Sequence, residues 1–194
     1  MFSAKPRIST LMLSSFIALS SSYAQQSGSA TAEAPVIVGR WQSEATENYG
    51  GHFATRSFTI SDREWQVTYQ TYADAQGKQA LFTIRVNGYY TLGEASVKVQ
   101  DAFEGTFPAR SRSITAESEA GVQMFAKMGC QLQLGQEKFL INSGCGFVPG
   151  VMQVMGEYDL AALKGDKLFL GDRASDLSKS RPDKLTPYPL VRVR

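Results

Sequence analysis

The chain has 194 residues, of which 43% are hydrophobic and 20% are charged, and these values exclude a disordered or collagen-like protein. Its formal net charge of +2 vanishes without Lys5 and Arg7, the only charged residues before position 25. The rest of the chain is neutral and has no long basic run, so the sequence gives no electrostatic reason to expect nucleic acid as a partner.

Residues 1–24 have the pattern of a secretory signal peptide, with a basic start, an apolar stretch over residues 8–19 and small residues around a cleavage site at Ala24. No later segment approaches the ~20 apolar residues of a membrane span, so we expect no transmembrane segment after signal removal. The cleavage site lacks a lipid-anchoring cysteine. These features predict an exported protein, either periplasmic or secreted.

Residues 25–35 are small, polar and unpatterned, which predicts a flexible leader before a single domain over residues 36–194. Apolar residues then alternate with polar ones, as in half-buried antiparallel strands. We expect a hairpin from strands 53–60 and 65–71. Further strands are expected at residues 81–87, 95–99, 102–107, 131–134, 151–160, 167–170 and 190–193, with turns at residues 74–77, 93–94 and 165–166.

One segment breaks this alternation. Residues 118–128 carry an N-capping Ser118, an acidic first turn and a stop at Gly129, which predicts one short helix packed against the sheet. Residues 171–189 are rich in turn formers and predict an extended surface segment before the last strand.

Cys130 and Cys145 are the only cysteines, and an even number in an exported chain favours a structural disulfide between them. His52 is the only histidine, so a hydrolase with a histidine base would have to use it, but no nucleophile elbow accompanies it. A structural His52 is the preferred interpretation. One histidine and two paired cysteines also give no metal site, and no cofactor motif is present.

Aromatic residues crowd into about 70 positions between Trp41 and Phe107, more than an open sheet needs unless it curls around them. The fold class that we predict is mainly β, an antiparallel lipocalin-like barrel or half-barrel with one short helix. Such a barrel removes sheet edges and either holds an apolar ligand or has a filled core.

Arg56 lies on the same predicted strand face as Phe58 and Ile60, so an inward Arg56 needs an acidic partner or a ligand head group. Glu104 is the candidate partner. The residues that we expect to bind a ligand are Arg56, Phe58, Trp65, Tyr69, Tyr72, Phe82, Tyr90 and Glu104.

The run over residues 39–90 resembles the domain of the adenomatosis polyposis coli down-regulated family, which dampens Wnt signalling in animals. The resemblance rests on Gly39-x-Trp41-x-Ser43, Gly51-x-Phe53-x-Thr55-Arg56-x-Phe58-x-Ile60, Tyr72-x-Asp74 and Gly88-Tyr-Tyr90, and it continues loosely to Val193. It implies a lipocalin-like barrel that accepts an acyl chain and performs no chemistry. In place of two cysteines of the animal members the chain has Thr46 and Gly77, as the loss of one disulfide would leave.

The leading hypothesis is an exported, non-enzymatic protein that binds a lipid or another apolar small molecule, as a single-domain, bacterial-type member of the family. The alternative is an envelope module with a filled core that binds another protein. A hydrolase that uses His52 is the third hypothesis, and it predicts an activity that His52→Ala removes.

Overall fold

The computed structural model describes residues 33–174 and 176–194, and these residues form eleven strands and one helix. The predicted signal peptide (1–24) and most of the predicted leader (25–35) lie outside the described residues. The elements are β1 (Gly39–Ser43), β2 (Glu47–Asn48), β3 (Phe53–Ile60), β4 (Glu64–Tyr72), β5 (Ala80–Tyr89), β6 (Thr91–Ala95), β7 (Phe103–Ala116), α1 (Glu119–Lys127), β8 (Glu137–Phe139), β9 (Gly156–Lys164), β10 (Lys167–Leu170) and β11 (Leu190–Arg192).

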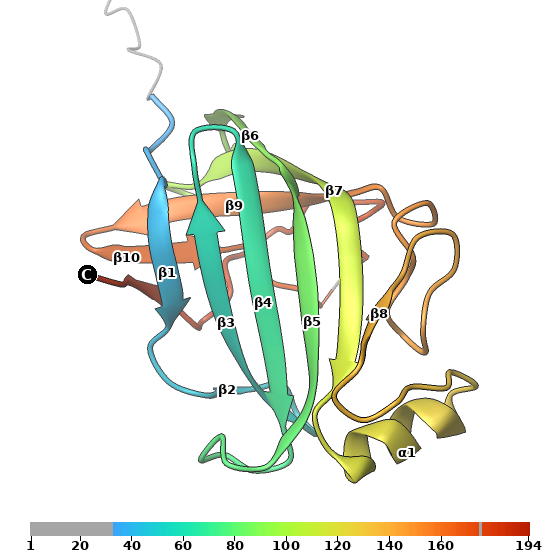
Figure 1. Cartoon of the computed structure of the whole chain (residues 1–194). Helices are drawn as coiled ribbons and strands as arrows, with labels where there is room; N and C mark the ends of the chain where they lie inside the picture. The colour runs from blue at the N-terminus through green and yellow to red at the C-terminus, as the bar shows by residue number, and fades with distance from the viewer. Residues whose placement is uncertain (1–32, 175) are drawn as a thin grey trace, which may run out of the picture. The chain divides into compact units, whose positions relative to one another are not determined.

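The antiparallel strand pairings close into a ring. The hydrogen-bonded order is β1, β11, β10, β9, β7, β5, β4 and β3, and β1 pairs with both β11 and β3. Strand β2 pairs with β3, while β6 and β8 pair with β7. Figure 1 shows β3, β4, β5 and part of β7 side by side, with β9 and β10 running across behind them. The ring therefore has two layers whose strands cross.

Strand β7 belongs to both layers. Its first half pairs with β9 over residues 103–108, and its second half pairs with β5 over residues 109–116. The register shifts between Asn87 and Gly88, where the two strands approach closely. A Cβ atom at Gly88 would lie 1.8 Å from the Pro108 carbonyl oxygen, so glycine is required at this bend.

Two apolar clusters occupy the inside of the ring. The first draws on both layers and buries Ile37, Trp41, Phe58, Ile60, Trp65, Val67, Phe107, Ala161, Leu168, Leu170 and Leu190. The second lies where α1 meets β5 and β7, and buries Phe82, Ile114, Ala116, Phe125, Cys130, Leu132, Leu140, Cys145 and Val148. Each fully buried large side chain stabilises the fold by roughly 1.5–3 kcal/mol. We call these the ring cluster and the helix cluster.

The predicted fold class is confirmed at the coarse level of a mainly β, antiparallel protein with one short helix. The helix begins after its N-cap, Ser118, whose side chain accepts a hydrogen bond from the Gly121 amide. The predicted strands at residues 53–60 and 167–170 match β3 and β10. Among the described residues, no helix is long and apolar enough to cross a membrane.

Some predicted elements are wrong. The strand expected at residues 95–99 is mostly a turn, because Ser96 Oγ accepts hydrogen bonds from the amides of Lys98 and Val99. The turn expected at residues 93–94 lies inside β6. Residues 131–134 form only an isolated bridge, between Leu134 and Ala116, and the strand expected at 151–160 begins at Gly156.

Candidate functional site

Arg56 faces the inside of the ring and forms a buried ion pair with Glu47. Their side chains are 5% and 2% exposed, and Arg56 Nε lies 2.9 Å from each Glu47 carboxylate oxygen. Ser43 Oγ donates to the same carboxylate, and Arg56 Nη2 donates to the Tyr188 carbonyl. The predicted pairing of Arg56 with Glu104 is therefore wrong: Glu104 lies on the outer face and pairs with Arg181, at 3.1 Å.

Aromatic side chains with polar tips surround this pair. Tyr49 donates its hydroxyl to Glu47, and a 3.0 Å hydrogen bond joins Tyr69 OH and His52 Nε2. The Tyr49 ring stacks on His52 and contacts Tyr69 and Tyr188. Burial raises the pKa of Tyr69 to about 12 and also raises the pKa of Tyr49, so both phenols stay neutral at physiological pH.

A second charged group reaches the inside of the ring from the segment after β10. Arg173 donates to Glu157 and lies 3.6 Å from Asp159, and both acids are on the inward face of β9. Burial raises the pKa of Asp159 to about 6, against the opposing charge of Arg173 and hydrogen bonds from two backbone amides. The Arg173 charge also acts on Tyr69, on the opposite layer.

Arg112 is a third inward arginine, on β7 opposite Val86 of β5. It is 5% exposed, and its Nη1 donates to the carbonyl oxygens of Pro149 and Gly150. Burial lowers the pKa of Arg112, while Glu157 raises it and Arg173 lowers it further. Among the described residues, Arg112 forms no salt bridge.

These groups form a polar layer between the two apolar clusters. The inward positions at this level of β4 and β5, Tyr69, Ile84 and Val86, are only partly buried, although each strand is paired on both sides. Val86 packs against the ring cluster and Ile84 against the helix cluster. The polar layer consists of Glu47, Tyr49, His52, Arg56, Tyr69, Arg112, Glu157, Asp159, Arg173 and Tyr188.

The eight predicted ligand-binding residues do not all meet. Five of them occupy alternate positions of β3, β4 and β5 that face the inside of the ring: Arg56, Phe58, Trp65, Tyr69 and Phe82. Tyr90 stacks on Phe107 beside the ring cluster. Tyr72 lies on the outer face, where its hydroxyl hydrogen-bonds with Thr55, and Glu104 is also outside.

Sequence reasoning missed five charged residues of the polar layer, among them Glu157 and Asp159 of β9. Glu47 lies on a two-residue strand, which is too short to show a pattern. Arg112 follows Pro108 in a run of basic and hydroxyl residues that resembles a loop, and Arg173 lies in the segment expected at the surface. An alternation count begun at Ile114 would have placed Arg112 on the inward face.

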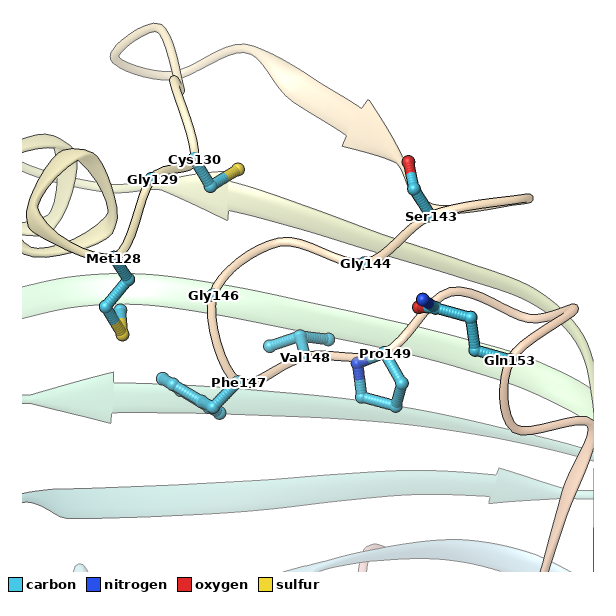
Figure 2. Close-up of a pocket in the computed structure, with 10 residues that line it drawn as sticks. All are labelled: Met128, Gly129, Cys130, Ser143, Gly144, Gly146, Phe147, Val148, Pro149 and Gln153. Carbon is cyan, nitrogen blue, oxygen red and sulfur yellow. The ribbon is translucent and has the colours of Figure 1, made fainter.

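The predicted disulfide between Cys130 and Cys145 is confirmed. It ties the end of α1 to a loop that lines a pocket of about 550 Å³. In Figure 2, Met128, Gly129 and Cys130 lie at the α1 side, and residues of the loop from Ser143 to Gln153 form the rest of the wall. A second pocket, of about 460 Å³, lies beside the start of α1. Neither is lined by any of the eight predicted ligand-binding residues.

Metal-binding clusters are also absent from the part of the chain that the structure describes, since no group of three potential ligand side chains occurs there. The aromatic hydroxyls, arginines and carboxylates of the polar layer are suited to hydrogen bonding and to charge pairing.

Thr46 and Gly77, which the resemblance places at two cysteine positions of the animal members, are neighbours in space. A Cβ atom at Gly77 would lie 3.2 Å from Thr46 Cγ2, close to the separation between the Cβ atom of one cysteine and the sulfur of its partner in a disulfide. The positions that the resemblance paired are thus adjacent in the fold.

The chain matches the model of a known protein family. The family model described as adenomatosis polyposis coli down-regulated 1 matches residues 20–143, more than half of the chain. No curated protein matches the chain. The chain therefore belongs to the adenomatosis polyposis coli down-regulated 1 family.

Proposed function

We propose that this chain is an exported, non-enzymatic binding protein whose ring of strands is a lipocalin-like barrel that holds a lipid or another apolar small molecule. It is a single-domain, bacterial-type member of its family in this proposal, and it acts in the periplasm or after secretion. The polar layer receives the head of the ligand, and the helix cluster receives its apolar part.

The observation that carries this proposal is the incomplete burial of inward side chains at the centre of the ring. Ile84 and Val86 lie on β5, which is hydrogen-bonded on both sides, so solvent reaches their side chains only from the interior. Arg173 is 43% exposed although its charge acts on the inward-facing Tyr69. Open space lined by apolar and polar groups together is typical of a small-molecule site.

Apolar surface is also accessible beside this space. Phe147 is 59% exposed, yet its ring lies 5.7 Å from that of Phe82 and 5.6 Å from that of Phe125. An acyl chain placed against Phe147 would extend the helix cluster and remove this aromatic surface from water.

The ring cluster limits where the ligand fits. Phe58 and Trp65 are 8% and 9% exposed and pack within that cluster, so this end of the ring is filled. The ligand in our proposal therefore occupies the middle of the ring and the side next to α1, and not the full length of the interior.

A filling substitution tests the proposal. Ile84→Trp places a large side chain in the interior, while Arg85→Trp places the same group on the adjacent, outward and exposed position of β5. We expect Ile84→Trp to weaken binding of a fluorescent fatty-acyl probe at least about tenfold, because the indole occupies the ligand's space, with Arg85→Trp close to wild type. Circular dichroism checks that both variants fold.

Two results together would refute the proposal: the wild-type chain binds no fatty-acyl probe, and native mass spectrometry of protein from its own compartment finds no co-purifying lipid.

The second candidate function, an envelope module that binds another protein, has its own supporting observation. Exposed apolar side chains gather in one stretch of the chain: Phe139, Ile141, Phe147, Met152 and Met155. Exposed apolar side chains that form a patch mark an interaction surface.

A further inference from the structure

Arg112 is a buried cation whose charge no carboxylate of the described residues pairs within 4 Å. The other two inward arginines are different, because Arg56 has Glu47 and Arg173 has Glu157. A buried guanidinium without an ion-pair partner is costly, since carbonyl oxygens supply hydrogen bonds but no compensating charge.

The guanidinium of Arg112 has N–H donors that bind no acceptor. Its two acceptors, the carbonyl oxygens of Pro149 and Gly150, both bind Nη1. Among the described residues, Thr115 Oγ1 is the one enclosed side-chain polar atom that lacks a partner. Nε and Nη2 of Arg112 have no acceptor and are not fully enclosed, so their N–H groups remain available to a ligand.

The acid whose charge acts on Arg112 already has another arginine as its partner. Glu157 acts on Arg112 through space, but it accepts a hydrogen bond from Arg173. The formal charge of the three inward arginines balances that of the three inward acids Glu47, Glu157 and Asp159, but two of these acids pair with Arg173. An added anion at Arg112 thus meets a cation that the protein leaves without a contact partner.

Apolar side chains flank this cation on the inside of the ring. Val86 lies directly opposite on β5, and Ile114 follows two residues later on the same face of β7. The Pro149 carbonyl that holds Nη1 belongs to the loop that also carries Phe147. A ligand with its charge at Arg112 can place its chain against the helix cluster.

We propose that Arg112 is the anchoring residue for an anionic head group, a carboxylate or a phosphate, on the apolar ligand that the ring holds. This inference rests on the proposed function and adds the chemical class of the ligand. A charge-assisted, forked hydrogen bond from a guanidinium suits both groups, whereas an alcohol or an ester offers no charge.

Three probes with the same chain test the charge: oleate, oleyl phosphate and oleyl alcohol, each competing with a fluorescent acyl probe below its aggregation concentration. We expect one or both anions to bind wild type at least about tenfold more tightly than the alcohol. The tighter anion identifies the head group. Equal binding of all three overturns the Arg112 proposal and leaves lipid binding standing, whereas no binding of any probe overturns both.

Two variants assign the effect to one arginine. Arg112→Gln keeps a donor for the Pro149 carbonyl but removes the charge, and it should lower anion affinity about tenfold while alcohol affinity stays within about twofold. Arg112→Lys should keep the preference for anions. Arg110→Gln is the matched control, because Arg110 lies on the same strand but is 56% exposed and pairs with Glu64.

Equal losses for anion and alcohol in Arg112→Gln would show a structural role and overturn the proposal. If that variant does not fold, side-chain nitrogen resonances in wild type decide, with Arg112→Lys providing their assignment. The Arg112 resonances should shift with oleate or oleyl phosphate and not with oleyl alcohol. An unchanged Arg112 signal in the presence of bound anion also overturns the proposal.

Discussion

At the scale of single residues, the Arg56–Glu47 pair should matter far more to stability than any surface pair. Glu47→Gln leaves a buried guanidinium without its charge partner, so we expect the free energy of unfolding to fall by about 3–5 kcal/mol. Glu44→Gln is the control: Glu44 pairs with Lys167 at 2.8 Å, but both are substantially exposed. That change should cost less than about 1 kcal/mol in urea unfolding.

A double substitution separates pairing from burial. Glu47→Gln with Arg56→Met removes both charges, and it should recover much of the stability that Glu47→Gln alone loses, because no unpaired charge is left. If Glu47→Gln unfolds at the same urea concentration as wild type, the ion pair contributes nothing and our account of Arg56 is wrong.

The sequence predicted the face of Arg56 correctly but not its partner. Alternation along β3 places Arg56 with Phe58 and Ile60, and this local property survives in the fold. Its partner depends on the register between β3 and β2, a contact that no periodicity in the sequence reveals. On pattern alone Glu104 was the better candidate for the partner of Arg56, since it lies in a clear apolar strand. In the structure Glu104 occupies an outward position of that strand.

At the scale of elements, β7 shows where alternation fails. The sequence predicted only residues 102–107, because Pro108 and the arginines that follow resemble a loop. In the structure the strand continues to Ala116, with Pro108 at the change of partner from β9 to β5. Crowding of aromatic residues predicted the curled sheet, whereas this bend depends on pairings between distant segments.

Two turns that lie far apart in sequence should accept a new cross-link. Thr46→Cys with Gly77→Cys joins the segment before β2 to the β4–β5 turn, where the two side-chain positions are adjacent. A loop of about thirty residues gives roughly 3–4 kcal/mol in the chain-entropy model. Because Gly77 has a φ of +66°, a cysteine there costs about 1–2 kcal/mol, which leaves a net gain of about 2 kcal/mol.

The measurement is the free energy of unfolding of the oxidised double variant against Thr46→Ala with Gly77→Ala, which carries the same backbone strain without the bond. Mass spectrometry of alkylated protein counts the free thiols. Two free thiols after oxidation would mean that the two positions are not close enough to bond, contrary to the structure.

At the scale of the whole molecule, closure of the ring depends on two pairings of β1, one with a nearby strand and one with the last strand. Strand β1 pairs with β3, only some ten residues later, and with β11 near the end of the chain. Composition and alternation predicted a mainly β protein with one helix. They could not predict that β11 follows β10 in the ring, because three residues of strand carry almost no pattern.

The stability of the whole molecule should depend on pH through Asp159, which binds the segment after β10 to strand β9. Its Oδ1 accepts the Gly171 amide at 2.7 Å, and Arg173 lies beside it. Burial raises the pKa of this carboxyl from 3.8 to about 6 in the folded protein. The folded state therefore holds this proton more tightly than the unfolded chain does, and the group's stabilising contribution is complete below about pH 4.

This contribution is lost as pH rises through about 6, at up to about 1.4 kcal/mol per pH unit between 4 and 6. Asp159→Asn keeps an acceptor for Gly171 and removes the titration, so the wild type should lose stability relative to the variant as pH rises across this window. Asp166→Asn, in the exposed turn between β9 and β10, is the control and should follow wild type. Urea unfolding at a series of pH values measures all three. Parallel curves for wild type and Asp159→Asn would mean that Asp159 binds its proton equally in both states, and that burial in the ring does not govern its charge.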